Sequence, residues 1–314
     1  MNHTILKSLL VLSLSAMMLA CGGSDGSSGD SGDVITDTPD ATNTDIPTDV
    51  SADIPEENVE ESTPPAPTAA APDFFDGVQP LQTVSSMLIG HDFPVDVLLP
   101  EGYADSPEKD YPVIYTTDGQ WVFPAFSQIT QDSGKEVILV SIHFPTEDRR
   151  GIDFLLPGSL TYYDFLRDEL MPIVEGQYRI DSNDRTYVGG SFGGMLGSTM
   201  LLVDDTHFPI FGKYLLFDPP FEHFHPQETA RLIEQRFEAR SVMDVDVLLT
   251  SALVASNIPV LDAGIQVFFE RISDRGFDEF SITKREFEET HHTIGGVSFE
   301  WMLDEFFPDP KENN

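Results

Sequence analysis

Cysteine is almost absent from this chain, and basic residues are scarce. Its 314 residues contain one cysteine, Cys21, so an intramolecular disulfide is excluded. Lysine and arginine together number 17 against 54 acidic residues, which gives a formal charge of −37. Because phosphate backbones are bound by clustered Lys and Arg side chains, this balance excludes nucleic acid as the expected partner.

The first 20 residues have the form of a secretory signal. Lys7 precedes the apolar run Ser8–Ala20, which is too short to span a bilayer. The run ends at Met18-Leu19-Ala20-Cys21-Gly22, which resembles a bacterial lipobox, where the cysteine becomes the lipidated first residue of the mature chain. We therefore predict a lipoprotein signal peptide over residues 1–20 and a lipid anchor at Cys21. By the same resemblance, Gly22 favours the outer membrane of the bacterial cell envelope.

Apolar residues are few in the next segment. Residues 22–72 contain 12 of the 54 acidic residues, no Lys or Arg, and mostly Gly, Ser, Thr, Pro and Ala otherwise. Such a composition cannot bury enough apolar surface to offset the entropy of ordering the chain. We predict a disordered acidic linker over residues 21–72 and a single domain over residues 73–314. This domain keeps 42 acidic residues against 16 basic ones, a formal charge of −26.

The domain alternates short β-rich runs with helical patterns, which is typical of a mainly parallel sheet covered on both faces. Helical spacing of apolar residues is clearest over Tyr162–Tyr178 and over Asp262–Asp274. Eight strands are predicted, over Val84–Ile89, Pro94–Leu99, Val113–Thr117, Val137–Ile142, Thr186–Val188, Tyr214–Phe217, Val245–Thr250 and Ile282–Phe287. The predicted fold class is α/β.

The segment Tyr187-Val188-Gly189-Gly190-Ser191-Phe192-Gly193-Gly194 contains the G-x-S-x-G pattern of a nucleophilic serine. The pattern follows a predicted strand and precedes a small-residue helix start, as the strained turn of a nucleophile elbow requires. Strand and helix approach closely there, so small residues are needed at Gly189 and Gly193. A plain Gly-rich turn with Ser191 as a helix N-cap is the alternative interpretation. We predict that Ser191 is a nucleophile.

Several spaced motifs together resemble the esterase D and enterochelin-esterase-like group of α/β-hydrolases. The resemblance covers about residues 80–308 and includes Tyr111–Gln120, Phe165–Val174 and Gly189–Gly194. It implies a single α/β-hydrolase domain with an eight-stranded, mostly parallel sheet. The group is similar in fold to feruloyl esterases, siderophore esterases and mycolyltransferases, which act through an acyl-serine. The resemblance therefore implies a small-molecule ester substrate and no metal or cofactor.

An acyl-serine mechanism needs two N–H donors that stabilise the oxyanion. One comes from the residue after the nucleophile and the other from the loop after the third strand. These positions correspond to Phe192 and Gln120. Both would act through the backbone, so their side chains neither support nor oppose the assignment.

The serine also needs a base, which the eight histidines of the chain can supply. In hydrolase chain order, the catalytic histidine follows the last strand, and the resemblance places it at His291 within Glu288–Thr293. His292 is the alternative base. A metal site formed by this pair with His223 and His225 is a further alternative, although no ligand spacing favours it.

The third triad member departs from the family pattern, in which an acid follows the seventh strand. Here that turn, Ser251–Asn257, contains no carboxylate. Asp218 ends the sixth predicted strand, whose tip neighbours that of the seventh, and we predict that Asp218 is the acid. Asp262 and a triad without an acid stay open as alternatives. An N-cap role on the following helix also accounts for Asp262.

These residues predict a serine carboxylic-ester hydrolase in which Ser191 attacks and His291 acts as base and then as acid. A surface-displayed binding lipoprotein on an inactive hydrolase scaffold is an alternative from another class, supported by the missing acid after the seventh strand. An acyltransferase is a third possibility, because the sequence does not distinguish water from another acceptor.

Overall fold

The computed structural model of the chain describes residues 75–205, 207–223 and 226–308. The signal peptide predicted over residues 1–20 and the linker predicted over residues 21–72 lie outside these ranges. Within the described ranges, no helix is both long and apolar enough to traverse a bilayer.

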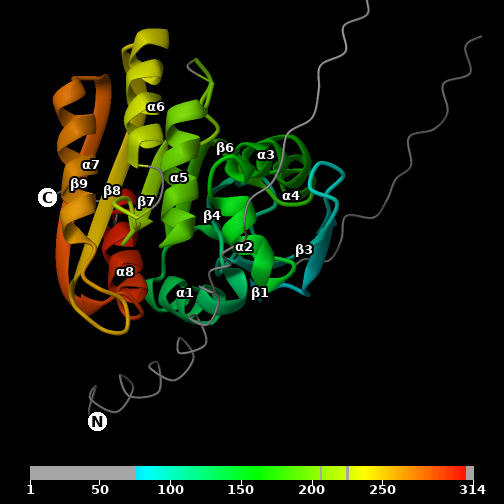
Figure 1. The fold of residues 1–314 in the computed structure, drawn as a ribbon. Coiled ribbons are helices and arrows are strands. Elements are labelled where there is room, and N and C mark those ends of the chain that lie inside the picture. Colours follow the sequence, from blue (N-terminus) through cyan, green and yellow to red (C-terminus); the bar gives the residue numbers. More distant parts are fainter. Residues whose placement is uncertain (1–74, 206, 224–225, 309–314) are drawn as a thin grey trace, which may run out of the picture. The chain divides into compact units, whose positions relative to one another are not determined.

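One nine-stranded sheet organises the described residues (Figure 1). Its strand order is β1-β3-β5-β4-β6-β7-β8-β9, and β2 pairs with β3. The antiparallel part consists of β1 (Gly77–Val78), β2 (Gln82–Ser85) and β3 (Asp92–Leu99). The parallel part consists of β4 (Tyr111–Thr116), β5 (Ile138–Ile142), β6 (Ile180–Gly190), β7 (Lys213–Phe217), β8 (Val242–Val254) and β9 (Asp278–Thr290). The predicted α/β class with a mostly parallel sheet is confirmed.

Every predicted strand overlaps an observed one, but the first prediction, Val84–Ile89, is wrong beyond Ser85. A turn begins there because the next backbone N–H groups bond to a side chain instead of a neighbouring strand. The Glu169 carboxylate accepts hydrogen bonds from the backbone N–H groups of Met87 and Leu88, at 2.9 and 3.3 Å. The short additional strand β1 is not evident in the sequence, since two residues carry no periodic signal.

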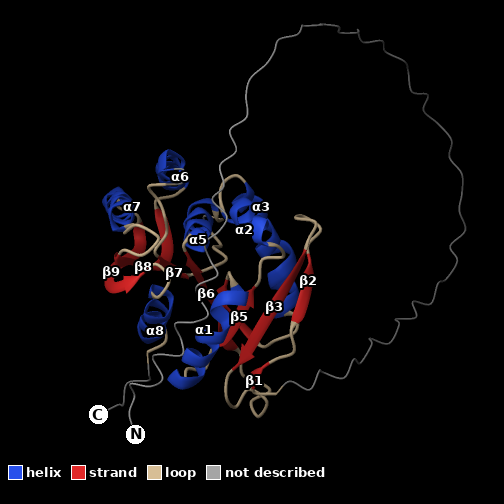
Figure 2. Cartoon of the chain, turned by 60° about the horizontal axis from the view of Figure 1, so that its bottom comes forward, coloured by secondary structure: helices blue, strands red, loops and turns tan. Residues whose placement is uncertain are grey.

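Helices cover both faces of the sheet, which Figure 2 shows from its edge. On one face lie α1 (Gly119–Ser133) and α8 (Ile294–Phe306). The other face carries α3 (Gly158–Phe165), α5 (Phe192–Val203), α6 (Pro226–Ala239) and α7 (Asp262–Arg275). The short helix α2 (Glu147–Phe154) follows β5 and contacts α3 and α5.

The helix predicted over Tyr162–Tyr178 is divided into three parts. A π-helical turn, Leu166–Leu170, separates α3 from α4 (Met171–Glu175). Proline lacks an N–H donor, and its ring collides with the carbonyl four residues earlier in a regular α-helix. Pro172 is the second residue after the π-helical turn, so the carbonyl four residues earlier lies within that turn. The wider turn therefore accommodates the proline. The spacing of apolar residues alone does not predict this interruption of the helix.

The two faces of the sheet bury separate cores because successive strand residues point to opposite sides. On β7, for example, Leu215 packs with the α1 and α8 side and Leu216 packs with the opposite side. Phe126 of α1 stacks on Phe299 of α8, with ring centroids 4.1 Å apart and planes 4° apart. This stack joins the two helices that close the smaller core.

We expect Phe299→Ala to lower the free energy of unfolding by about 3–5 kcal/mol, since a fully buried aromatic ring leaves a cavity when truncated. Phe208→Ala is the matched control, because the Phe208 side chain is 82% exposed and should contribute within about 0.5 kcal/mol. Urea denaturation followed by circular dichroism measures both values. A free-energy loss in Phe299→Ala as small as the loss expected for Phe208→Ala would show that the stack does not stabilise the domain.

Candidate active site

The predicted site residues gather at the carboxyl ends of the parallel strands. Gln120 follows β4, Ser191 follows β6, Asp218 follows β7 and His291 follows β9. The backbone connects these tips, since Ser191 N–H donates to the Phe217 carbonyl at 2.9 Å, at the tip of β7. Parallel register thus brings residues that are distant in sequence to one edge of the sheet.

Ser191 has a strained backbone between β6 and α5. Its φ of 53° and ψ of −119° are unusual for a residue with a side chain. Although Ser191 stands at the N-cap position of α5, its side chain makes no capping hydrogen bond. Ser191 therefore holds the N-cap position of the alternative interpretation, but this half-buried residue makes no capping bond through its hydroxyl.

The elbow depends on a very close approach between strand and helix. A Cβ atom on Gly189 would lie 2.4 Å from the Gly193 carbonyl oxygen, and one on Gly190 would lie 1.9 Å from the Phe217 ring. The Tyr187 hydroxyl donates to the same Gly193 carbonyl at 2.8 Å. Burial raises the pKa of Tyr187 far above its usual range, so this hydroxyl stays protonated and remains a donor.

Asp218 and His291 form a buried hydrogen-bonded pair. Oδ2 of Asp218 lies 2.6 Å from Nδ1 of His291, and the two residues are 1% and 9% exposed. The second carboxylate oxygen accepts a hydrogen bond of 3.0 Å from the Ala252 N–H. With Nδ1 engaged, Nε2 is the ring nitrogen left for proton exchange with a hydroxyl.

Asp262 is engaged elsewhere. Its Oδ1 lies 2.7 Å from the Ser251 hydroxyl and 2.6 Å from the Lys284 ammonium group. Partial burial opposes ionisation of this carboxyl, but the hydrogen bonds from Lys284 and Ser251 outweigh it and lower its pKa. The expected N-cap role is also wrong, since Leu261 holds the N-cap position of α7.

His292 lies beside His291 but has a different partner. Its Nε2 is 2.6 Å from Oδ1 of Asn257. Burial, and next the charge of His291, lower the pKa of His292. Nδ1 of His223 lies 3.5 Å from Oε1 of Glu222, and His225 lies outside the described residues. In the described part of the chain, no group of three or more His, Cys, Asp and Glu side chains is arranged to hold a metal ion.

The two predicted oxyanion donors lie at helix starts. Gln120 is the second residue of α1 and Phe192 is the first residue of α5. N–H groups in a first helical turn have no intrahelical acceptor, and the positive end of the helix dipole lies there. Both N–H groups can therefore bind a developing negative charge.

Backbone strain is concentrated at this edge. Among the described residues, four residues other than glycine have positive φ, and three of them are Asp118, Ser191 and Asp218, at 61°, 53° and 49°. Each follows or nearly follows a strand that supplies the site. Strained residues persist where the surrounding structure holds them, and they cluster at functional sites.

Arg150 of α2 is a residue that the sequence reasoning missed. Its guanidinium forms a bidentate pair with Asp118, at 2.7 and 2.8 Å. The only available signal was the neighbouring pair Arg149-Arg150 in a chain poor in basic residues. Such a pair does not reveal which arginine points inward.

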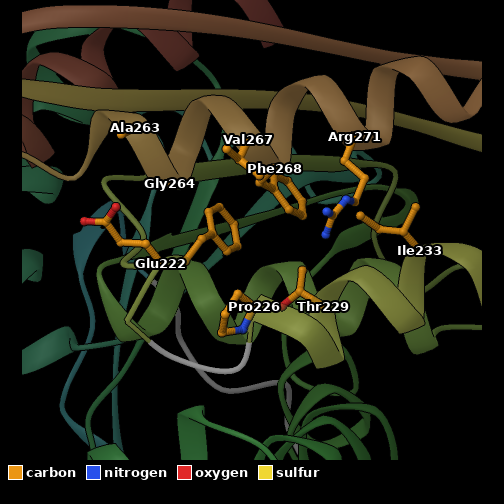
Figure 3. Close-up of a pocket in the computed structure, with 10 residues that line it drawn as sticks. Glu222, Pro226, Thr229, Ile233, Ala263, Gly264, Val267, Phe268 and Arg271 are labelled. Carbon is orange, nitrogen blue, oxygen red and sulfur yellow. The ribbon is translucent and has the colours of Figure 1, made fainter.

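A cavity of about 370 Å³ lies between α6 and α7 (Figure 3). Its lining includes Phe221, Glu222, Phe268 and Arg271 but none of Ser191, Asp218 and His291. The cavity is therefore separate from the cluster described above.

Comparisons with known proteins find similarity in part of the sequence and in the fold. Residues 85–214 match a family model described as "Putative esterase". The matched part contains Gln120, Ser191 and Phe192, and it ends before Asp218 and His291. No match was found among curated protein sequences.

Solved structures share the fold. An IroE-like serine hydrolase from Shewanella oneidensis is 23% identical, with a TM-score of 0.61, over 70% of this chain and 77% of the other. Siderophore hydrolase EstB from Aspergillus nidulans is 16% identical, with a TM-score of 0.63, over 76% and 99% of the two chains. The enterobactin and salmochelin hydrolase IroE is 18% identical, with a TM-score of 0.55, over 73% and 94%. Part of the chain thus resembles an esterase family, and the chain shares the fold of these solved hydrolases.

Proposed function

We propose that the protein hydrolyses a small-molecule carboxylic ester through an acyl-serine intermediate on Ser191. The observation that carries the proposal is the 2.6 Å contact between Asp218 and His291 at the sheet edge that presents the strained Ser191. A carboxylate in this position fixes the imidazole tautomer and stabilises the imidazolium that forms during catalysis.

The reaction follows from these positions. Ser191 Oγ attacks the ester carbonyl carbon while Nε2 of His291 accepts the hydroxyl proton. The Gln120 and Phe192 N–H groups bind the tetrahedral oxyanion, and its collapse expels the alcohol, which takes the proton from His291. Water then attacks the acyl-serine with His291 again as base, which releases the carboxylic acid and restores Ser191.

The alternative of an inactive binding scaffold loses its main support. That alternative depended on the turn after β8, which contains no acid. Asp218 lies against His291 from the neighbouring strand, so a carboxylate is present where the histidine needs one. An acyltransferase differs only in the acceptor of the acyl group, and adding alcohols to the assay distinguishes transfer from hydrolysis by the products formed.

The choice of substrates to test follows from the comparisons. Two of the structural neighbours described above are named for hydrolysis of siderophores or of enterobactin and salmochelin. We therefore propose siderophore-type esters first, with feruloyl and nitrophenyl esters as the comparison set. Turnover of none of these classes would count against the ester-hydrolase proposal.

Ser191→Ala should abolish covalent labelling by a fluorophosphonate probe and lower the hydrolysis rate by about 10⁴-fold or more, because the nucleophile itself is lost. Ser273→Ala is the matched control, since Ser273 is exposed on α7. Gel fluorescence and the initial rate on a nitrophenyl ester measure the two effects. Labelling that persists in Ser191→Ala would place the nucleophile elsewhere.

Asp218→Asn should lower kcat by at least about 10²-fold, and His291→Ala by about 10⁴-fold, because each removes half of the buried pair. Asp262→Asn and His292→Ala are the neighbouring controls and should retain activity within about tenfold, since their contacts lie with Lys284 and Asn257. Steady-state kinetics measure all four variants. A larger loss in either control than in its partner would reverse the assignment.

We further propose that lipidation of Cys21 tethers this esterase to the bacterial envelope, at the outer membrane. The support is the lipobox-like segment Met18–Gly22 and the acidic segment that follows it. A chain of 52 residues from 21 to 72 would let the domain act away from the membrane surface.

Cys21→Ser should move the protein from the membrane fraction to the soluble fraction, because the lipid is the only anchor proposed. Globomycin should cause the unprocessed form to accumulate, and the control Ser24→Ala should stay with the membrane. Fractionation and immunoblotting give the distribution. Membrane association of Cys21→Ser equal to that of the original chain would rule out the anchor.

A further inference from the structure

Arg150 is a buried cation beside the catalytic residues for which the mechanism above has no role. Its side chain is 11% exposed, and a buried charge is costly unless it is paired. The pair is made with Asp118, whose side chain is 4% exposed. The two oxygens of the carboxylate meet two nitrogens of the guanidinium, the fork geometry that fixes both orientation and distance.

The guanidinium contacts both segments that carry the oxyanion donors. Asp118 lies two residues before Gln120 in the turn from β4 to α1. Nη2 of Arg150 also donates to the Gly190 carbonyl at 3.3 Å, one residue before Ser191. One side chain thus links the turn after β4 to the elbow after β6.

Aromatic rings strengthen this link. The Arg150 guanidinium carbon lies 5.5 Å from the Trp121 ring centroid and 5.1 Å from the Phe192 ring centroid. Trp121 follows Gln120, and Phe192 is itself the second donor residue. Trp121 in turn packs edge-on against Phe144, with centroids 4.9 Å apart. Cation–π contacts therefore attach Arg150 to both sides of the oxyanion hole.

Fixed donors are what an oxyanion hole requires, because donors that must move during the reaction lose much of their electrostatic benefit. Asp118 has a φ of 61°, a conformation that its surroundings must hold in place. The Asp118 carboxylate also neutralises Arg150, so the guanidinium is not available as a free charge for substrate. Its effect on catalysis must then come from geometry.

We infer that Arg150 is a positioning residue that holds the Gln120 and Phe192 N–H groups at the spacing a tetrahedral oxyanion requires. The inference rests on the proposed acyl-serine function. It adds a determinant of catalytic rate on α2, which contributes none of the proposed nucleophile, base, acid or oxyanion donors.

The neighbouring Arg149 supplies a matched control. It pairs with Asp153 one turn further along α2, with Nε 3.1 Å from Oδ2. This pair has the same residue types and also engages two guanidinium nitrogens. Loss of Arg149 therefore reports the cost of removing an arginine–aspartate pair from α2 alone.

The test compares Arg150→Met, Arg150→Lys and Arg149→Met for kcat, KM, pH profile and melting temperature on a nitrophenyl ester. Arg150→Met should lower kcat by about 10²-fold, with KM within about threefold and the acidic midpoint of the pH profile unchanged. Arg150→Lys should recover less than a tenth of the lost rate, because an ammonium group lacks the fork. Arg149→Met should keep kcat within about twofold.

A double-mutant cycle identifies the partner. Asp118→Asn should cost about as much in kcat as Arg150→Met, and the double variant should cost little more, since the two side chains act as a unit. Additive losses would overturn the inference.

The remaining outcomes separate this inference from the proposed function. A folded Arg150→Met enzyme with unchanged kcat would overturn the positioning role alone, as would a loss confined to KM, which would make Arg150 a substrate ligand. Equal kcat losses in the Arg149 and Arg150 variants would assign the effect to α2 stability and overturn it too. An unaltered protein that neither labels nor turns over any ester would overturn both proposals.

Discussion

The contact between β6 and α5 at the elbow is the constraint on which the site depends. Strand and helix meet so closely that a single added methyl group at Gly189 would collide with the Gly193 carbonyl. The sharp turn that results holds Ser191 in a strained conformation and directs the start of α5 toward the same edge. A larger residue at Gly189 would separate β6 from α5 and displace the serine hydroxyl and the Phe192 N–H together, because both belong to the one turn.

Two buried side-chain pairs lie beside this turn, and each contains an aspartate with positive φ. Asp118 pairs with Arg150, and Asp218 pairs with His291. A buried carboxylate without a partner would be strongly destabilising, so each strained turn is linked to a side chain from another element. Each pair therefore helps to hold its aspartate in the strained conformation. The packing energy of the cores on both faces of the sheet offsets the cost of that strain.

Local patterns made the fold and the elbow predictable, whereas long-range partners were not. The strands follow from runs of apolar residues, and Ser191 follows from glycines within two residues of it. Arg150 is 32 residues from Asp118, and no periodicity links them. The turn after Ser85 depends on Glu169, 81 or more residues away, so the predicted strand ran too far. Sequence patterns report burial, but the identity of a polar partner depends on the assembled sheet.

Asp218 shows how a carboxylate on an unexpected strand can still contact the histidine. Adjacent parallel strands lie about 4.8 Å apart, so a carboxylate at the tip of β7 reaches nearly the same space as one after β8. The Asp218 N–H donates to Thr250 of β8 at 2.9 Å, and the Ala252 N–H donates back to the Asp218 carboxylate at 3.0 Å. The last residues of β8, which contain no carboxylate, thus supply a hydrogen bond to the carboxylate at the tip of β7. That bond orients one carboxylate oxygen and leaves the other directed at His291, which is the geometry that the proposed base requires.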